Sequence, residues 1–340
     1  WYLYEPTPNG FYGNTYQRGL LTFKDIYDNK GNLVSKENYK YKDTFVRNIY
    51  GIEPFKFNKN SESAVVRQYI SATMYKVPIG KSVKTSTESI EYRNGVAMQQ
   101  VQRYSYNAYD LPSRTVTCYN DGDSTITTTS YPFELKYGVY PTMFSKRVLA
   151  YPVETIIKGV GKAYDMRLRT YEENKGMFLL KEDYALALNN SASIAAYNGQ
   201  DKDVHYGIPD FKVVSYDHQG HIASIIDRNG KEHVFVWNVH GQLLLHVENA
   251  ALSDVQTYCP KMLDGQVTDA QISQLRNALK KCFVTNYKYR LGNIISITDS
   301  RNQTMSYSYD GFGRLIEERD NDGNVTKAYK YKIATENELH

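Results

Sequence analysis

Short stretches in which apolar and polar residues alternate recur along the chain, separated by glycine, asparagine and aspartate. HIASIID at residues 221–227 and TMSYSYD at residues 304–310 are two examples. Both are rich in β-branched and aromatic residues and have the length of a hairpin strand. Apolar residues at the 3.6-residue spacing of a helix are absent from them. The pattern therefore predicts a mainly β chain, a long twisted antiparallel sheet of consecutive hairpins.

These stretches belong to a repeat of about 21 residues in the last third of the chain. Each copy has a glycine, an isoleucine or leucine two residues later, an aspartate seven residues after the glycine, and glycine or asparagine three residues after the aspartate. The clear copies are Gly220, Ile222, Asp227 and Gly230; Gly292, Ile294, Asp299 and Asn302; and Gly313, Leu315, Asp320 and Gly323. A fourth copy, starting at Trp237, has Glu248 at the aspartate position, and YDNKGNL at 27–33 repeats the first half of the pattern.

The spacing of aspartate and glycine predicts turns. Aspartate at the first position of a four-residue turn accepts hydrogen bonds from nearby backbone N–H groups, and glycine at the fourth adopts positive φ without strain. Each repeat is thus expected to hold two short strands and two turns. The residues assigned to these turns are Gly220, Asp227, Gly230, Gly241, Gly292, Asp299, Gly313, Asp320 and Gly323.

Tyrosines, of which there are 32, supply a second period. Because residues two apart on a strand share a face, the motifs YKY and YSY place two rings on one side of the sheet. Stacked hairpins would align these rings into ladders, whose cross-strand pairs contribute about 0.2 to 1 kcal/mol each. The main interpretation is structural; the alternative is sugar binding by stacking on exposed rings. The candidate stacking residues are Tyr287, Tyr289, Tyr307, Tyr309, Tyr329 and Tyr331.

One helix is predicted near residues 268–281, inside an insertion at about residues 250–284. Thr268 and Gln271 form a capping box, and Ile272, Leu275 and Leu279 then line one helical face. We expect this helix to pack over the sheet or to cover one of its ends. Cys259 and Cys282 bracket the helix, so the sequence allows either a disulfide that closes the insertion or two free buried thiols.

The chain divides into two regions that differ in how clearly the repeat can be recognised. Residues 1–200 are expected to form a degenerate β-meander region, and residues 201–340 the repeat hairpin region with the helical insertion. A soft boundary is placed at residues 191–210, where the sequence is polar and small.

Charge and hydropathy exclude some classes of function. Lys and Arg total 41 against 37 Asp and Glu, and the two signs are interspersed, which does not favour a nucleic-acid partner. No run of 18 apolar residues is present, so insertion of this segment into a membrane is not expected. The chain begins and ends inside repeat-like sequence and is interpreted as a piece of a longer polypeptide.

Catalytic or metal chemistry is not indicated. Six of the seven histidines lie between His205 and His246, but they occupy variable positions of the repeat, whereas zinc needs three or four convergent ligands. Asp227, Asp299 and Asp320 already have a role in turns. Nucleophile-elbow, P-loop, HExxH and dinucleotide motifs are absent. The expectation is a chain without an active site, metal or cofactor.

The segment YDGFGRLIEERDNDG, from Tyr309 to Gly323, resembles the motif YDxxGRLxxxxDxxG of Rhs/YD-repeat proteins. The wider arrangement of repeats around a helical insertion resembles large surface-associated Rhs-repeat proteins of Bacteroidetes-type bacteria. The resemblance implies β-hairpins strung into a long spiralling sheet, in some members closed into a shell around a toxin. The chain lacks a terminal core motif of the RYxxPxxGRF kind, a proteolytic release site and a toxin domain.

The expected function is a non-catalytic extracellular or cell-surface scaffold that presents an interaction surface to other macromolecules or cell-surface glycans. The alternative is a carbohydrate-binding module with exposed tyrosine platforms. A polysaccharide-processing enzyme and a segment of a toxin-encapsulating shell are weaker alternatives.

Overall fold

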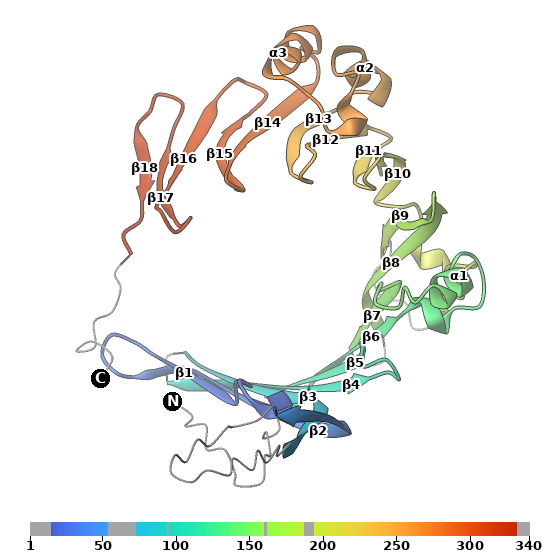
Figure 1. Ribbon diagram of the computed structural model, residues 1–340, viewed down its shortest axis with the longest axis vertical. Coiled ribbons are helices and arrows are strands. Elements are labelled where there is room, and N and C mark those ends of the chain that lie inside the picture. Colours follow the sequence, from blue (N-terminus) through green and yellow to red (C-terminus); the bar gives the residue numbers. More distant parts are fainter. Residues whose placement is uncertain (1–14, 54–72, 94, 160–161, 187–193, 332–340) are drawn as a thin grey trace, which may run out of the picture. The chain divides into compact units, whose positions relative to one another are not determined.

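The computed structural model describes residues 15–53, 73–93, 95–159, 162–186 and 194–331. Eighteen strands occur in this part of the chain, in an antiparallel sheet in which neighbours in the sequence pair with one another (Figure 1). The predicted mainly β fold of consecutive hairpins is confirmed. The chain forms two compact units, residues 1–130, 155–164 and 190–193, and residues 131–154, 165–189 and 194–340, here called unit 1 and unit 2. The division at residues 200 and 201, based on repeat clarity, stays a prediction.

Unit 1 contains long, exposed strands. Its first six strands are β1 (Phe23–Tyr27), β2 (Leu33–Glu53), β3 (Thr73–Arg93), β4 (Val96–Tyr106), β5 (Pro112–Tyr119) and β6 (Ser124–Ser130). Strands β2 and β3 pair along 18 residue pairs, from Ser35 with Glu91 to Glu53 with Thr73. β7 (Glu154–Gly159) follows β6. Exposed and half-buried residues alternate at the end of β4 (102–106) and at the start of β5 (112–115), which is the period-2 pattern of a half-buried sheet.

Unit 2 contains the clear copies of the repeat. Its strands are β8 (Lys162–Asn174, from Asp165 on), β9 (Met177–Ala185), β10 (Phe211–Tyr216), β11 (Ile222–Asp227), β12 (Glu232–Trp237), β13 (Leu243–Glu248), β14 (Phe283–Arg290), β15 (Asn293–Thr298), β16 (Thr304–Tyr309), β17 (Leu315–Arg319) and β18 (Val325–Ala328). Each of these strands pairs antiparallel with the next. The strands reverse at Gly220, Gly230, Gly313 and Gly323, as predicted.

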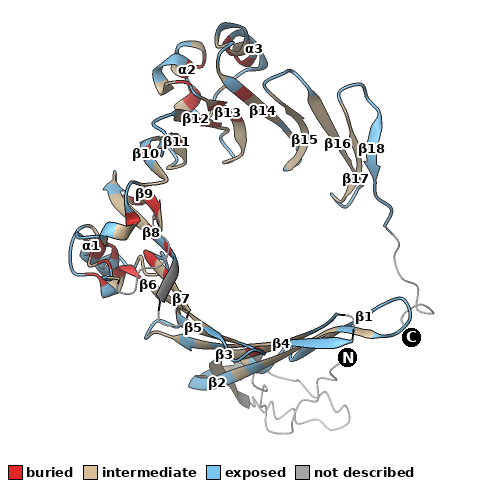
Figure 2. Ribbon diagram, turned by 180° about the vertical axis from the view of Figure 1, so that it is seen from behind, coloured by how far each residue is buried: buried red, intermediate tan, exposed pale blue. Residues whose placement is uncertain are grey.

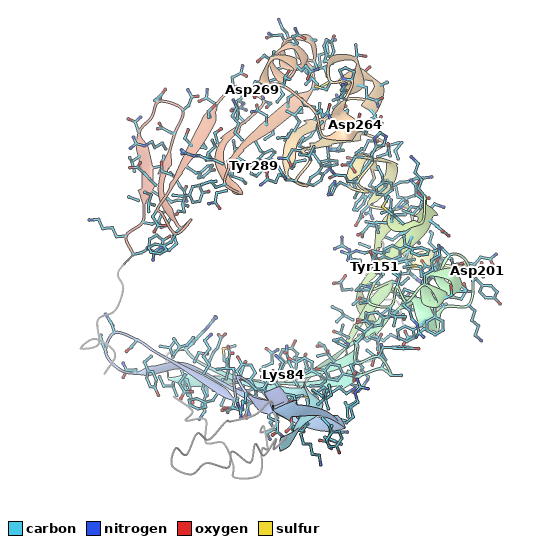
Figure 3. All side chains as sticks on the ribbon, in the orientation of Figure 1. Lys84, Tyr151, Asp201, Asp264, Asp269 and Tyr289 are labelled. Carbon is cyan, nitrogen blue, oxygen red and sulfur yellow. The ribbon has the colours of Figure 1, made fainter. Side chains whose placement is uncertain are left out.

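The helical insertion forms the main hydrophobic core of unit 2. Helices α2 (Leu252–Tyr258) and α3 (Asp269–Ala278) lie over one face of β12, β13 and β14 (Figures 1 and 2). The buried residues of this cluster are Val234, Val236, Leu245, Val247, Ala250, Val255, Cys259, Met262, Ile272, Leu275 and Val284. Asp269 at the start of α3 binds Lys288 of β14, 2.8 Å away, while Tyr289 projects from the opposite face of that strand (Figure 3). The prediction that the insertion packs over the sheet agrees with this arrangement.

The helix prediction requires two corrections. The capping box of Thr268 and Gln271 is present, but α3 ends at Ala278 and not at residue 281. The insertion also holds α2 and a 3-10 turn, Met262–Asp264, which the sequence did not predict. α2 has only seven residues and no side-chain cap, so its sequence carries neither a capping signal nor a long periodic stripe. Packing against the sheet stabilises it.

A second buried cluster lies beside β8 and β9, where α1 (Tyr140–Ser145) was also not predicted. Tyr140 and Met143 of α1 and Leu168 of β8 are almost completely buried. Glu154, 2% exposed, accepts hydrogen bonds from the Tyr206 hydroxyl at 2.9 Å and the Tyr197 backbone N–H at 3.1 Å. These donors compensate the burial of the carboxylate.

Of the two states that the sequence allows for Cys259 and Cys282, the structure has the one without a disulfide. Cys259 and Cys282 are both free thiols. Cys259 is fully buried in the cluster under α2 and α3, and desolvation raises the pKa of its thiol to about 11. Cys282 lies at the edge of the cluster, where its Sγ is 3.1 Å from the Asn249 carbonyl oxygen. The side chain of Cys259 thus takes part in apolar packing as a free, buried thiol.

Candidate functional site

The repeat turns share one hydrogen-bond pattern, illustrated by the turn at Asp227. Its Oδ1 accepts from the backbone N–H groups of Asn229 at 2.9 Å and Lys231 at 2.8 Å. The Gly230 N–H donates to the Asp227 carbonyl at 2.9 Å, and Gly230 has φ +78°. One aspartate therefore accepts hydrogen bonds from two N–H groups that the strands leave unpaired, and the glycine supplies the positive φ that closes the turn.

Except for Gly292, the predicted turn residues take part in such turns. Asp299 and Asp320 have the same two backbone donors, at residues two and four positions later. Gly220, Gly241, Gly292, Gly313 and Gly323 have positive φ, and Asn302 takes the place of glycine at φ +63°. These contacts give the aspartates a structural role.

The structure adds residues that the sequence reasoning missed. Asp217, Asn238 and Asp310, which precede Gly220, Gly241 and Gly313 by three positions, accept the same pairs of backbone hydrogen bonds. The turns at these three positions are therefore of the same type as the turn at Asp227. The turn between β14 and β15 differs, because it has Tyr289 at the aspartate position and positive φ at both Leu291 (+50°) and Gly292 (+86°). The signal was present, because the aspartate of the YDxxG pattern stands at the same offset from its glycine as Asp227 does from Gly230.

At four positions of the repeat array, an aromatic residue ties its hairpin to the preceding one. Its ring N–H or hydroxyl donates to the carbonyl of the residue two positions after the preceding turn glycine. The pairs are Trp237 with Ile222 (2.7 Å), Tyr289 with Leu243 (3.0 Å), Tyr309 with Ile294 (2.8 Å) and Tyr331 with Leu315 (2.8 Å). Two landmarks of the repeat, the aromatic residue and the isoleucine or leucine, thus meet across the boundary between copies.

The candidate stacking tyrosines are divided by exposure. Tyr287, Tyr289, Tyr307 and Tyr309 are half-buried, whereas the side chains of Tyr329 and Tyr331 are 37% and 46% exposed. Within the described part of the array, ring pairs involve His221 with Trp237 and His246 with His233 and Phe235, and no tyrosine ladder is formed. Hydroxyl-to-carbonyl bonds replace the expected ring ladder. Sugar stacking by these tyrosines stays a prediction.

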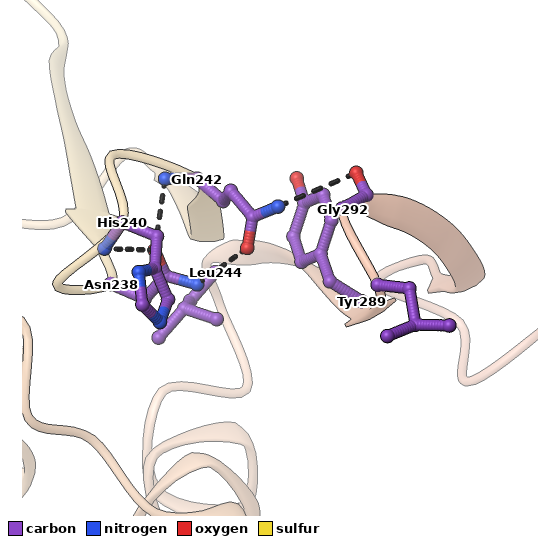
Figure 4. Close-up of a pocket in the computed structure, with 7 residues that line it drawn as sticks. Asn238, His240, Gln242, Leu244, Tyr289 and Gly292 are labelled. Carbon is purple, nitrogen blue, oxygen red and sulfur yellow. Dashed lines mark hydrogen bonds between the residues drawn. The ribbon is translucent and has the colours of Figure 1, made fainter.

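A shallow cavity of about 540 Å³ lies beside two successive turns (Figure 4). It is lined by Asn238, His240, Gln242, Leu244, Tyr289, Leu291 and Gly292. The Gln242 side chain bridges the turns, because its Oε1 accepts from Asn238 Nδ2 at 2.8 Å and its Nε2 donates to the Gly292 carbonyl at 3.4 Å. Amides, one imidazole and a tyrosine ring suit a neutral polar ligand. The lining has no carboxylate that would serve as a general acid or base.

The histidines form separate pairs. His221 Nδ1 lies 2.8 Å from Asp217, His218 Nδ1 lies 2.6 Å from Asp264, and His246 stacks on Phe235. Burial lowers the pKa of His246. Over the described ranges, no group of three or more His, Cys, Asp or Glu side chains is arranged to hold a metal ion. Likewise, none of the described helices is long and apolar enough to cross a membrane.

The fold and its turns define an antiparallel β-hairpin repeat protein. Residues 289–325 match the family model RHS Repeat, so the chain contains an RHS repeat and the Rhs/YD resemblance is confirmed there. No curated protein matches the chain.

Among the solved structures to which the chain is similar are two TcdB2-TccC3 structures and a porin-like protein. The TcdB2-TccC3-Cdc42 complex is 11% identical with a TM-score of 0.32, over 89% of this chain and 15% of that one. TcdB2-TccC3 without its hypervariable C-terminal region is 10% identical with a TM-score of 0.26, over 88% and 19%. A porin-like protein from Bacteroides uniformis is 11% identical with a TM-score of 0.21, over 87% and 79%. The chain spans less than a fifth of the first two, and the family assignment rests on the repeat itself.

Proposed function

We propose that the chain is a non-catalytic scaffold, exposed on the cell surface or secreted as part of a larger RHS-repeat protein, that presents its hairpins to another macromolecule. One observation carries this proposal: the recurring aspartates and aromatic groups of the repeat are engaged in turns and in ties between hairpins. The variable side chains between them remain available for contact. The RHS repeat at 289–325 supports the structural role.

Two measurements on the full-length protein test this proposal. A membrane-impermeant amine reagent is expected to label the protein on intact producing cells, because its lysines are exposed along the strands. Incubation of the purified chain with a panel of polysaccharides is expected to release no new reducing ends. Labelling only after lysis would refute the surface location, and release of reducing ends would refute the non-catalytic role.

Carbohydrate binding is the second candidate, favoured by the exposed rings of Tyr329 and Tyr331. Arg314 lies 4.4 Å from the centre of the Tyr331 ring and covers one face of that ring, so a sugar would stack on the other face. Glycan-array binding that is lost in the Tyr329→Ala and Tyr331→Ala variants, but kept in Lys330→Ala between them, would support this role. Unchanged binding in all three variants would exclude these two rings.

A further inference from the structure

A second cavity, of about 390 Å³, lies on β8, β9 and β10 within unit 2. Its lining combines cationic and aromatic side chains, including Tyr151, Arg167, Arg169, Tyr171, Phe211 and Tyr216. Tyr151 projects on the side of the strands away from Asp201 (Figure 3). A volume of this size is in the range of small-molecule sites and accommodates one sugar ring.

Successive side chains of β8 point to opposite faces of the sheet, and this places two arginines on the face that lines the cavity. Met166 and Leu168 are buried on one face of β8, so Arg167 and Arg169 project from the other. Arg169 pairs with Asp183 on β9, and Asp183 pairs with Phe211 on β10. The guanidinium, carboxylate and ring therefore lie in one row across three strands.

The carboxylate in this row is shared by the two arginines, so Asp183 balances only one of their two positive charges. Asp183 is 2% exposed, and its Oδ1 and Oδ2 accept from Nε and Nη2 of Arg167, each at 2.9 Å. Oδ2 also accepts from Nε of Arg169 at 3.0 Å. The described residues give neither Nη group of Arg169 a hydrogen-bond partner. These two Nη groups lie beside the cavity and can donate a pair of charge-assisted hydrogen bonds to an anionic ligand.

The hydroxyl of Tyr216 is a second, independent feature. Tyr216 stands before the first YD-type turn of the array, at the repeat position where Trp237, Tyr289 and Tyr309 donate to a preceding hairpin. No such repeat precedes it in unit 2, and its buried hydroxyl has no hydrogen-bond partner among the described residues. A buried hydroxyl without a hydrogen-bond partner destabilises the folded protein. A ligand oxygen in the cavity would remove this cost.

We propose that this cavity binds an acidic sugar, a hexuronic acid residue of a polysaccharide. The sugar carboxylate accepts hydrogen bonds from the Nη groups of Arg169, the ring lies against Tyr151 and Tyr171, and a sugar oxygen accepts from the Tyr216 hydroxyl. Tyr151 and Tyr171 pack edge to face at 5.2 Å, and the Tyr171 hydroxyl donates to the Pro152 carbonyl at 3.0 Å, which fixes this wall. The inference deepens the proposed function, since it names a ligand for the scaffold.

Calorimetric titration of the full chain with a trigalacturonate tests the proposal. Affinity for this acidic sugar is expected to exceed that for neutral maltotriose by about tenfold or more, which corresponds to about 1.4 kcal/mol. It is also expected to weaken as NaCl rises, because salt screens the exposed guanidinium. Equal affinity for the two sugars, or binding of neither at millimolar concentration, would overturn the proposal. Binding of a sulfated but not a carboxylated trisaccharide would overturn the assignment of the carboxylate.

Three variants complete the test. Arg169→Gln leaves Asp183 paired with both nitrogens of Arg167, so the protein should fold while affinity falls about tenfold. Tyr216→Phe should weaken binding without lowering the midpoint of thermal unfolding, a result that a purely structural hydroxyl would not give. Arg319→Gln, which removes an exposed arginine paired with Glu317 outside the cavity, should bind as the parent does. Unchanged affinity in Arg169→Gln refutes the site, whereas surface labelling of intact cells independently reports the scaffold role.

Discussion

At the scale of single residues, the turn aspartates explain most of the pattern in this sequence. Each accepts hydrogen bonds from backbone N–H groups two and four residues later, contacts that depend only on nearby sequence. This locality is why Asp227, Asp299 and Asp320 could be assigned to turns from their spacing alone. Asp217 and Asp310 obey the same rule, because each lies three residues before the glycine of its turn.

Replacing Asp217 by alanine should lower the free energy of unfolding by about 1 to 3 kcal/mol, because the backbone N–H groups of Gln219 and His221 lose the buried carboxylate that accepts their hydrogen bonds. Asp217→Asn should retain most of that free energy, since Asn238 fills the equivalent position with the same two donors. Urea denaturation of both variants measures the difference. Equal destabilisation would show that the charge, and not the acceptor oxygen, stabilises the turn.

The turn at Asp320 makes stability depend on pH. The Asn324 backbone N–H holds the pKa of Asp320 below its usual 3.8 in the folded protein. A carboxylate with a lowered folded pKa stabilises the fold above its unfolded pKa, and this contribution is lost as the pH falls through the folded value. The urea concentration at the unfolding midpoint should therefore decrease as the pH is lowered from 5 to 2. In the Asp320→Asn variant this decrease should be smaller. An identical pH profile in the variant would contradict this role.

At the scale of elements, hairpins are joined by contacts between residues far apart in the sequence. The Tyr309 hydroxyl reaches the Ile294 carbonyl of the previous strand, and Tyr289 reaches Leu243 in the same way. The sequence placed these tyrosines on one face of the sheet but suggested ring ladders. Hydroxyl orientation depends on the stagger between strands, which a periodic pattern does not specify.

Tyr309→Phe is expected to lower the free energy of unfolding by about 0.5 to 1.5 kcal/mol, because the Ile294 carbonyl loses its donor. Tyr307, two residues earlier on β16, has no hydrogen bond from its hydroxyl in the described structure and provides a matched control. Tyr307→Phe should change stability by less than half as much. Urea denaturation measures the stability of both variants. Equal stability would contradict a stabilising hydrogen bond from the Tyr309 hydroxyl to the Ile294 carbonyl.

Helix α3 is tied to the strands through Arg276. Its Nη1 donates to the Val284 carbonyl at 2.9 Å and to Asn286 Oδ1 at 3.0 Å, and its Nε donates to Asn302 Oδ1 at 3.0 Å. Desolvation lowers the pKa of this guanidinium. One side chain thus joins α3 to β14 and to the turn between β15 and β16.

Arg276→Met keeps the alkyl packing but removes all of these donors. We expect a loss of about 2 to 3 kcal/mol in the free energy of unfolding, since buried acceptors lose charged partners. Amide hydrogen exchange should accelerate at residues 299–303, at the turn that Arg276 contacts. Lys280→Met, on the exposed side of the same segment, is the control and should leave that exchange unchanged.

At the scale of the whole molecule, burial is uneven within unit 2. The cluster beneath α2 and α3 holds eleven buried residues, whereas none of residues 293–328 is buried (Figure 2). Apolar burial contributes about 25 cal/mol per Å². Hairpins β15–β18 therefore depend on backbone pairing, turns and tyrosine ties much more than on a core.

Native-state hydrogen exchange is expected to follow this division. Amides of β12, β13 and β14 should open only with the unfolding of the α2–α3 cluster, and those of β16, β17 and β18 should exchange faster through local opening. Mass spectrometry of peptides from the intact chain measures both. Slower exchange in β17 and β18 than in β13 would contradict the proposed distribution of stability.

The sequence by itself determined the hairpins, their turns and the capped start of α3, because these depend on hydrogen bonds between residues a few positions apart. Tertiary structure decided what lies between distant residues: the ties of Tyr289 and Tyr309, the packing of α2 on the sheet and the free thiol of Cys259. It also decided the cavity at Arg169, since strand pairing alone brings Asp183 and Phe211 into one row. Such contacts depend on register and on which face each element covers, and neither is encoded in a local period.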